Sequence, residues 1–113
     1  MRDIKFRKWS KETNRYLPDE NGFYWLKANK YIEFMNKEDV IEQYTGMEDE
    51  GNTEIFEGDI LKEIYDGTII GSVEYIDDYA MFWCGTMPLY DVAPDGQVCG
   101  NIHEDNELLG EQE

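Results

Sequence analysis

The stretch that decides the fold is Gln43-Tyr44-Thr45-Gly46-Met47-Glu48-Asp49-Glu50-Gly51-Asn52-Thr53-Glu54-Ile55-Phe56-Glu57-Gly58-Asp59-Ile60-Leu61. It contains three glycines and ends in an apolar run that is typical of a β-strand. An acidic turn around Gly51-Asn52 divides it. The stretch therefore predicts an acidic hairpin, followed by a strand that begins at Asp59.

The charge balance of the chain changes sign at the start of this stretch. Residues 1–44 hold nine Lys/Arg against eight Asp/Glu, a balance of +1, whereas residues 45–113 hold only Lys62 against eighteen Asp/Glu, a balance of −17. The asymmetry predicts an acidic surface that faces a basic partner or the more basic part of a second copy. The alternative is that self-repulsion keeps the protein soluble. Direct binding of nucleic acid is not expected, because affinity for phosphate comes from cationic side chains.

Length and composition indicate one domain with a single modest core. The chain has 113 residues, and its 14% of aromatic residues argues against disorder. Charged residues near the start and the lack of a long apolar run predict a soluble, cytoplasmic protein with no membrane contact. Cys84 and Cys99 are expected to be reduced, with a disulfide between them left open.

Short strands separated by turns account for most of the sequence. Before the central stretch, we expect strands at 4–7, 23–26 and 31–35, a polar turn at 10–15 and a hairpin turn at Asn21-Gly22. A helical turn at 36–39 stays open, and residues 40–44 are too short and too β-branched for a helix.

After the central stretch, we expect strands at 59–65, 68–76 and 79–84, an edge segment at 88–90 and a strand at 97–99. Asp66-Gly67 predicts a type I′ turn, and Asp77-Asp78 predicts the next turn. The pattern is that of a small barrel or sandwich with an acidic tail.

Three motifs in order resemble the YopX family of phage and prophage proteins. They are the central stretch, an opening Met1-Arg2-Asp3-Ile4-Lys5-Phe6-Arg7-Lys8-Trp9, and a closing Gly100-Asn101-Ile102-His103-Glu104. The resemblance implies one mainly β domain, in which a small N-terminal β portion (1–44) packs on a C-terminal SH3-type barrel-like portion (45–113). It implies no catalytic residue and no cofactor. The motif residues expected to serve structure or interaction are Trp9, Tyr44, Thr45, Gly46, Gly51, Glu57, Gly58, Asp59, Gly100 and Asn101.

Three patterns could carry chemistry, and each has a structural alternative. Glu48, Glu50 and Glu57 fall at ligand positions of a calcium loop around Gly51, but the first position is Gly46, so a plain acidic hairpin is favoured.

Glu57 and Asp59 could act as general acid and base, although a bulge at Gly58 and capping of a backbone amide by Asp59 are favoured. Cys99 and His103 could pair as nucleophile and base, with Cys84 as a third candidate; buried thiols and a structural histidine are favoured.

The aromatic residues exceed what a small barrel can bury, so some are expected to line a groove or a subunit contact. We therefore expect a non-enzymatic phage or prophage accessory protein that acts by protein–protein interaction, as a homo-oligomer. An acidic decoy for a basic nucleic-acid-binding protein is the alternative, and an enzyme built on Glu57/Asp59 or Cys99/His103 is a third.

Overall fold

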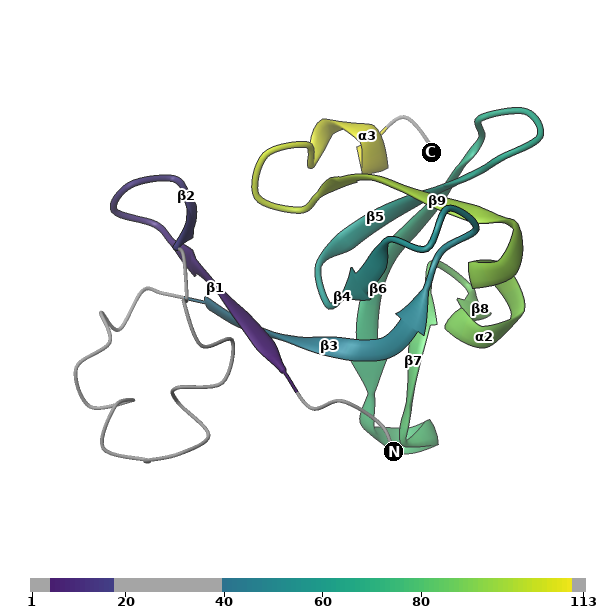
Figure 1. The fold of residues 1–113 in the computed structure, drawn as a ribbon, viewed down its shortest axis with the longest axis horizontal. Helices are drawn as coiled ribbons and strands as arrows, with labels where there is room; N and C mark the ends of the chain where they lie inside the picture. The colour runs from purple at the N-terminus through teal and green to yellow at the C-terminus, as the bar shows by residue number, and fades with distance from the viewer. Residues whose placement is uncertain (1–4, 18–39, 111–113) are drawn as a thin grey trace. The chain divides into compact units, whose positions relative to one another are not determined.

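The computed structural model describes residues 5–17 and 40–110 (Figure 1). The chain divides into two compact units, Met1–Tyr44 and Thr45–Glu113. Strand β3 (Val40–Glu48) contributes its first half to one unit and its second half to the other. The strands expected at 23–26 and 31–35, the Asn21-Gly22 turn and the helical turn at 36–39 lie outside the described residues.

In the first unit, β1 (Phe6–Ser10) pairs antiparallel with both β2 (Arg15–Leu17) and the start of β3. The predicted polar turn joins β1 to β2, and it closes with a hydrogen bond of 2.8 Å from the Asn14 amide to the Ser10 carbonyl. The short strand β2 was missed by the sequence analysis. Trp9 is buried, with its ring edge-on to Tyr16 at a centroid distance of 5.0 Å.

In the second unit, five antiparallel strands form a curled sheet in the order β8-β7-β6-β5-β9. Strand β4 (Glu54–Phe56) pairs with the second half of β3 as the predicted acidic hairpin. The strands of the sheet are β5 (Asp59–Glu63), β6 (Ile69–Ile76), β7 (Met81–Cys84), β8 (Met87–Pro88) and β9 (Gly96–Asn101). The predicted mainly β fold is confirmed. Pro88 lies on an edge strand, as its missing amide hydrogen requires.

Short helical segments lie between these strands and after the last of them. They are η2 (Asp77–Tyr79), α2 (Leu89–Val92), η3 (Ala93–Asp95) and α3 (Glu107–Gly110). The sequence analysis extended its third strand back to residue 79, but Tyr79 belongs to η2 and β7 starts at Met81. It also missed α2, because it placed an edge segment over residues 88–90. Among the residues that the structure describes, no helix is both long and apolar enough to cross a bilayer.

The expected type I′ turn at Asp66-Gly67 is wrong. The Gly67 amide donates to the Glu63 carbonyl at 2.9 Å, and the Glu63 amide donates to the Thr68 carbonyl at 2.8 Å, so a five-residue loop (64–68) joins β5 to β6. A type I′ turn needs positive φ at both central residues, whereas only Gly67, at φ 77°, is positive here. Asp66 instead accepts a hydrogen bond of 2.9 Å from the Thr68 amide, which stabilises the longer loop.

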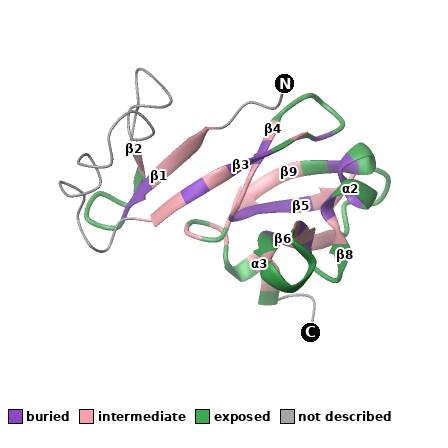
Figure 2. Ribbon diagram, turned by 90° about the horizontal axis from the view of Figure 1, so that it is seen from below, coloured by how far each residue is buried: buried purple, intermediate pink, exposed green. Residues whose placement is uncertain are grey.

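The core of the second unit lies against β5. Asp59, Ile60 and Leu61 are consecutive and all buried, so both faces of this strand are covered (Figure 2). Ile55, Cys84 and Leu89 are fully buried in the same unit. A fully buried Leu or Ile side chain contributes about 1.5–3 kcal/mol relative to an exposed one.

A glycine pair and irregular registers shape the sheet. The pairing register shifts between Ile60 and Leu61 on the β9 side and between Leu61 and Lys62 on the β6 side. A Cβ on Gly71 would lie 2.5 Å from the Gly85 Cα, so only glycine permits this approach between β6 and the turn after β7. The irregular pairing increases the local twist and bends the strands.

Candidate functional site

Asp49 accepts three backbone hydrogen bonds that fix the central stretch, although the sequence analysis did not identify it. It is 5% exposed. Its Oδ1 accepts hydrogen bonds of 2.9 Å from the amides of Gly51 and Thr53, and its Oδ2 accepts one of 2.9 Å from the amide of Val98 on β9. One carboxylate thus closes the β3–β4 turn and connects it to the five-stranded sheet of the same unit.

The calcium-loop alternative does not match the architecture of this stretch. Its flanks are the strands β3 and β4 rather than helices. Gly51 lies in the turn that Asp49 closes. Across residues 5–17 and 40–110, no group of three or more His, Cys, Asp or Glu side chains is placed to hold a metal ion.

Thr45 and Gly46 shape the strand before that turn. The buried hydroxyl of Thr45 donates to the Ile55 carbonyl at 2.8 Å and accepts from the Met47 amide at 3.2 Å, which links β3 to β4. Gly46 has φ 85°, a value that other residues rarely adopt. In the first unit, Tyr44 is buried and its amide donates to the Lys5 carbonyl at 2.8 Å. These motif residues therefore have structural roles.

Glu57 and Gly58 form the turn between β4 and β5, and Asp59 begins β5. Asp59 is buried, and its Oδ2 accepts a hydrogen bond of 2.8 Å from the Phe56 amide, so the expected backbone cap is confirmed. The expected bulge at Gly58 is wrong: Gly58 lies in the turn itself at φ 85°, and the register shifts occur farther along β5. Its amide donates to the Val73 carbonyl and its carbonyl accepts from the Ile102 amide, both at 2.9 Å.

Gly100 and Asn101 build the turn after β9. A Cβ on Gly100 would lie 2.5 Å from Oδ2 of Asp105, so the carboxylate packs directly over the glycine. Asn101 Oδ1 accepts from the amides of His103 and Glu104 at 2.9 and 3.0 Å. The closing motif is thus a capped turn.

The two cysteines are free thiols, as expected. Burial raises the pKa of Cys84 to about 12, and its Sγ donates to the Gly71 carbonyl at 3.4 Å. Burial also raises the pKa of Cys99, an effect that Lys62 opposes and Asp105 reinforces. A nucleophilic thiol needs a lowered pKa, so this environment disfavours thiolate chemistry at Cys99.

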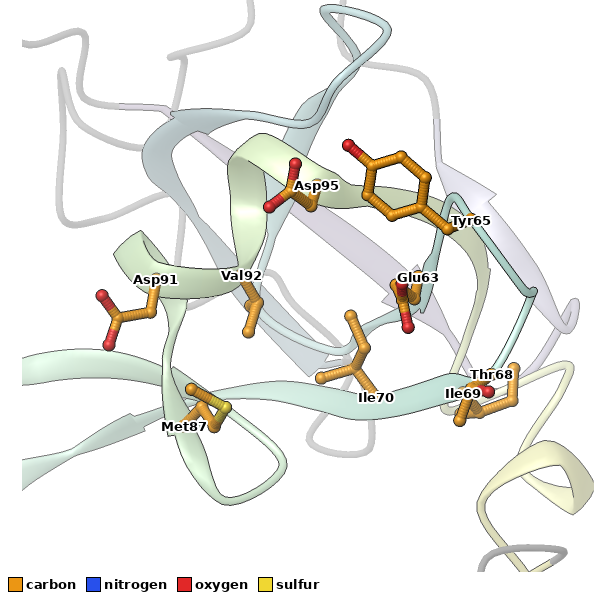
Figure 3. A pocket seen from close by; sticks show the side chains of 9 residues that line it. All are labelled: Glu63, Tyr65, Thr68, Ile69, Ile70, Met87, Asp91, Val92 and Asp95. Atoms are coloured by element: carbon orange, nitrogen blue, oxygen red, sulfur yellow. The ribbon is translucent and has the colours of Figure 1, made fainter.

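A pocket of about 320 Å³ lies in the second unit, and none of these motif residues lines it (Figure 3). Ile70 on β6 and Val92 on α2 point into it from opposite sides, and Met87 on β8 adds a third apolar surface. Three acidic residues, Glu63, Asp91 and Asp95, are among its lining residues, and Asp91 and Asp95 are exposed. The pocket therefore combines an apolar interior with acidic walls.

A hydrogen bond connects two walls of the pocket. The Ile64 amide, directly after β5, donates to the Asp95 carbonyl of η3 at 3.0 Å. The β5–β6 loop carries Tyr65, which is 76% exposed and lies beside the pocket. Desolvation is the largest cause of the raised pKa of Glu63, and the charge of Asp66, a hydrogen bond with Asp66 and the charge of Asp95 raise it further.

The sequence analysis missed the pocket. Its lining comes from β5, β6, β8, α2 and η3 and the loop between β5 and β6. The only local signal was the i, i+4 spacing of Asp91 and Asp95, which places two acidic residues on one side of a helical turn.

Comparisons with known proteins agree with this architecture. The crystal structure of protein EF1440 from Enterococcus faecalis is similar to this chain, with a TM-score of 0.64 and 22% sequence identity over 95% of this chain and 98% of that chain. At this identity the similarity shows the fold alone. No curated protein matches the chain. The family profile described as YopX protein matches residues 5–110, and the chain therefore belongs to the YopX family.

Proposed function

We propose that this protein is a non-enzymatic interaction protein, encoded by a phage or prophage and active in the host cytoplasm, that binds a basic protein surface through its acidic C-terminal unit. The observation that carries the proposal is the balance of −17 over residues 45–113, together with an acidic-walled pocket in that unit. An acidic surface steers a basic partner and speeds its association. The protein would occupy that partner and keep it from other acidic ligands.

The candidate catalytic residues Glu57, Asp59 and Cys99 fit structural roles better than catalytic ones. Asp59 accepts a backbone amide and is buried, and the pocket is lined neither by it nor by Glu57. The raised pKa of Cys99 opposes its use as a nucleophile. These residues therefore support a binding function better than a catalytic one.

Affinity capture from host lysate tests the proposal. The immobilised chain should retain a basic protein at about 0.01 M salt and release it at about 1 M, because the Debye length falls from about 30 Å to about 3 Å over that range. An unrelated acidic protein of similar isoelectric point, about 4.2, serves as the control for unspecific charge attraction. If the chain retains no basic protein beyond those on the control, the proposal is wrong.

Self-association is the second candidate, and exposed tyrosines support it. Tyr65, Tyr75, Tyr79 and Tyr90 are 76%, 44%, 61% and 56% exposed, and protein interfaces are enriched in tyrosine. Opposing it, two copies that each carry −16 repel one another, and the +1 balance of residues 1–44 offers little attraction.

Light scattering at low and high salt separates these cases. Association through tyrosines should strengthen with salt, because salt screens the repulsion, whereas a head-to-tail contact between unlike charges should weaken. A mass of 13.3 kDa at both salt concentrations would leave a separate basic protein as the partner.

A further inference from the structure

The pocket in the C-terminal unit has the chemistry of a receptor for one kind of side chain. We propose that it binds an arginine side chain, presented by a basic segment of a partner protein. This inference rests on the proposed function and names the site through which the partner is held.

The apolar interior matches the aliphatic stem of such a side chain. Ile70 and Val92 face each other across the pocket, and Met87 is 44% exposed beside them (Figure 3). Lys and Arg bury a three- or four-carbon stem along apolar surface while the charged head stays polar. A volume of about 320 Å³ is at the lower end of the ligand-pocket range of about 300–1,000 Å³, which suits one long side chain and its immediate neighbours.

The carboxylates match the charged head. Glu63, Asp91 and Asp95 lie around the apolar interior, and none of the lining residues is basic. Lys62 is the single Lys/Arg in the whole of residues 45–113, so this unit is far short of the cations needed to balance its own acids. A charged group from outside would supply that charge and form charge-assisted hydrogen bonds with the carboxylates.

Tyr65 adds a third complementary feature. Its ring is 76% exposed and lies at the pocket wall. A cation over an aromatic face gains about 0.5–1 kcal/mol at exposed sites, and guanidinium groups do so most often. An apolar stem, an acidic environment and an aromatic face together select an extended cationic side chain over a neutral ligand.

A second copy is a poorer occupant than a separate basic protein. Two chains of −16 must approach closely for one to enter the pocket of the other, and the repulsion opposes every such encounter. The separate basic protein of the proposed function brings attraction at long range and the fitting side chain at short range.

Fluorescence anisotropy with the intact chain tests the inference. The probe is a labelled nonapeptide with one central arginine and two flanking lysines in a Gly/Ser background. A second peptide replaces the arginine by glutamine and gains one lysine at its end, so its net charge is unchanged. The first peptide should bind about fivefold more tightly than the second, because only it offers the guanidinium to the pocket.

Two charge-matched double variants identify the site. Asp91→Asn with Asp95→Asn removes two carboxylates from the pocket, whereas Asp77→Asn with Asp78→Asn removes two exposed carboxylates from η2 in the same unit. We expect the first pair to lower affinity about tenfold and the second pair less than about threefold, because only the first removes direct contacts.

Tyrosine variants test the aromatic face. Tyr65→Ser should weaken binding about threefold, and Tyr65→Phe should retain it because the ring face remains. Tyr90→Ser, outside the pocket lining, should have no effect.

Equal losses of affinity in both aspartate pairs would overturn the pocket as the binding site while leaving charge-driven binding intact. If the unaltered chain binds neither peptide, the proposed function fails together with the inference.

Discussion

Asp49 is the residue on which the central stretch depends most. Its carboxylate accepts three backbone amides, and one of them, from Val98, lies 49 positions away in the sequence. A buried acceptor with all its partners in place is stable, but buried amides left without a partner are costly. Asp49 is therefore a structural residue despite its charge and its position in an acidic turn.

Asp49→Ala should destabilise the protein strongly. It removes the acceptor of three amides; water can replace it at the exposed Gly51 and Thr53 but less readily at the half-buried Val98, so we expect a loss of about 2 kcal/mol. Asp49→Asn should cost less, because its remaining oxygen still accepts. Urea unfolding measures both, with Glu50→Ala at the exposed neighbouring position as a control near zero. A loss below about 1 kcal/mol in Asp49→Ala would contradict this role.

The thiols should be slow to react in the folded protein. With a pKa of about 12, Cys84 holds roughly one thiolate in ten thousand molecules at pH 8, and it is fully buried. The raised pKa of Cys99 also lowers its thiolate fraction, so its labelling rate should rise with pH through the alkaline range. Alkylation followed by mass spectrometry checks this, with Cys99→Ser isolating Cys84. Labelling of Cys99 at neutral pH faster than a free thiol would revive the Cys99/His103 hypothesis.

At the residue scale, contacts between residues close in sequence were predictable, whereas contacts between residues far apart in sequence were not. The cap made by Asp59 was predicted because it closes on the amide of Phe56 three positions earlier. Asp49 was missed because its defining contact, to Val98 on β9, exists only once the sheet has formed.

At the scale of elements, the alternation of strand and turn patterns in the sequence was sufficient to predict a mainly β fold. The turn between β5 and β6 was placed correctly, yet its type was wrong because the capping bond from Thr68 to Asp66 was not foreseen. The pocket was beyond prediction, since it needs β5, β6, β8, α2 and η3 to meet. Helix α2 is one turn long, too short for a periodic signal.

The contact between β6 and the turn after β7 should not tolerate a side chain. Gly71→Ala places a Cβ 2.5 Å from the Gly85 Cα, and we expect a loss of more than about 2 kcal/mol from overpacking. Gly67→Ala is the matched control: it also has positive φ but open space, so it should cost only about 1 kcal/mol of backbone strain. Chemical unfolding compares the two, and equal losses would mean that backbone conformation alone matters at Gly71.

At the scale of the molecule, the net charge of −16 opposes the compact state. Raising NaCl from about 0.01 M to about 0.2 M should therefore increase the unfolding midpoint by a few degrees, because screening weakens the repulsion. A variant that combines Asp77→Asn, Asp78→Asn, Asp91→Asn and Asp95→Asn should show a smaller increase. A midpoint that falls with salt would mean that attractive ion pairs dominate.

The most direct test of the account maps the basic nonapeptide on the uniformly ¹⁵N-labelled chain by chemical-shift perturbation at low salt. The account predicts that the largest shifts fall on amides within 63–70 and 87–95, which carry the pocket, and that shifts at 77–80 are small. Perturbations spread evenly over the acidic residues, or concentrated at 77–80, would contradict it.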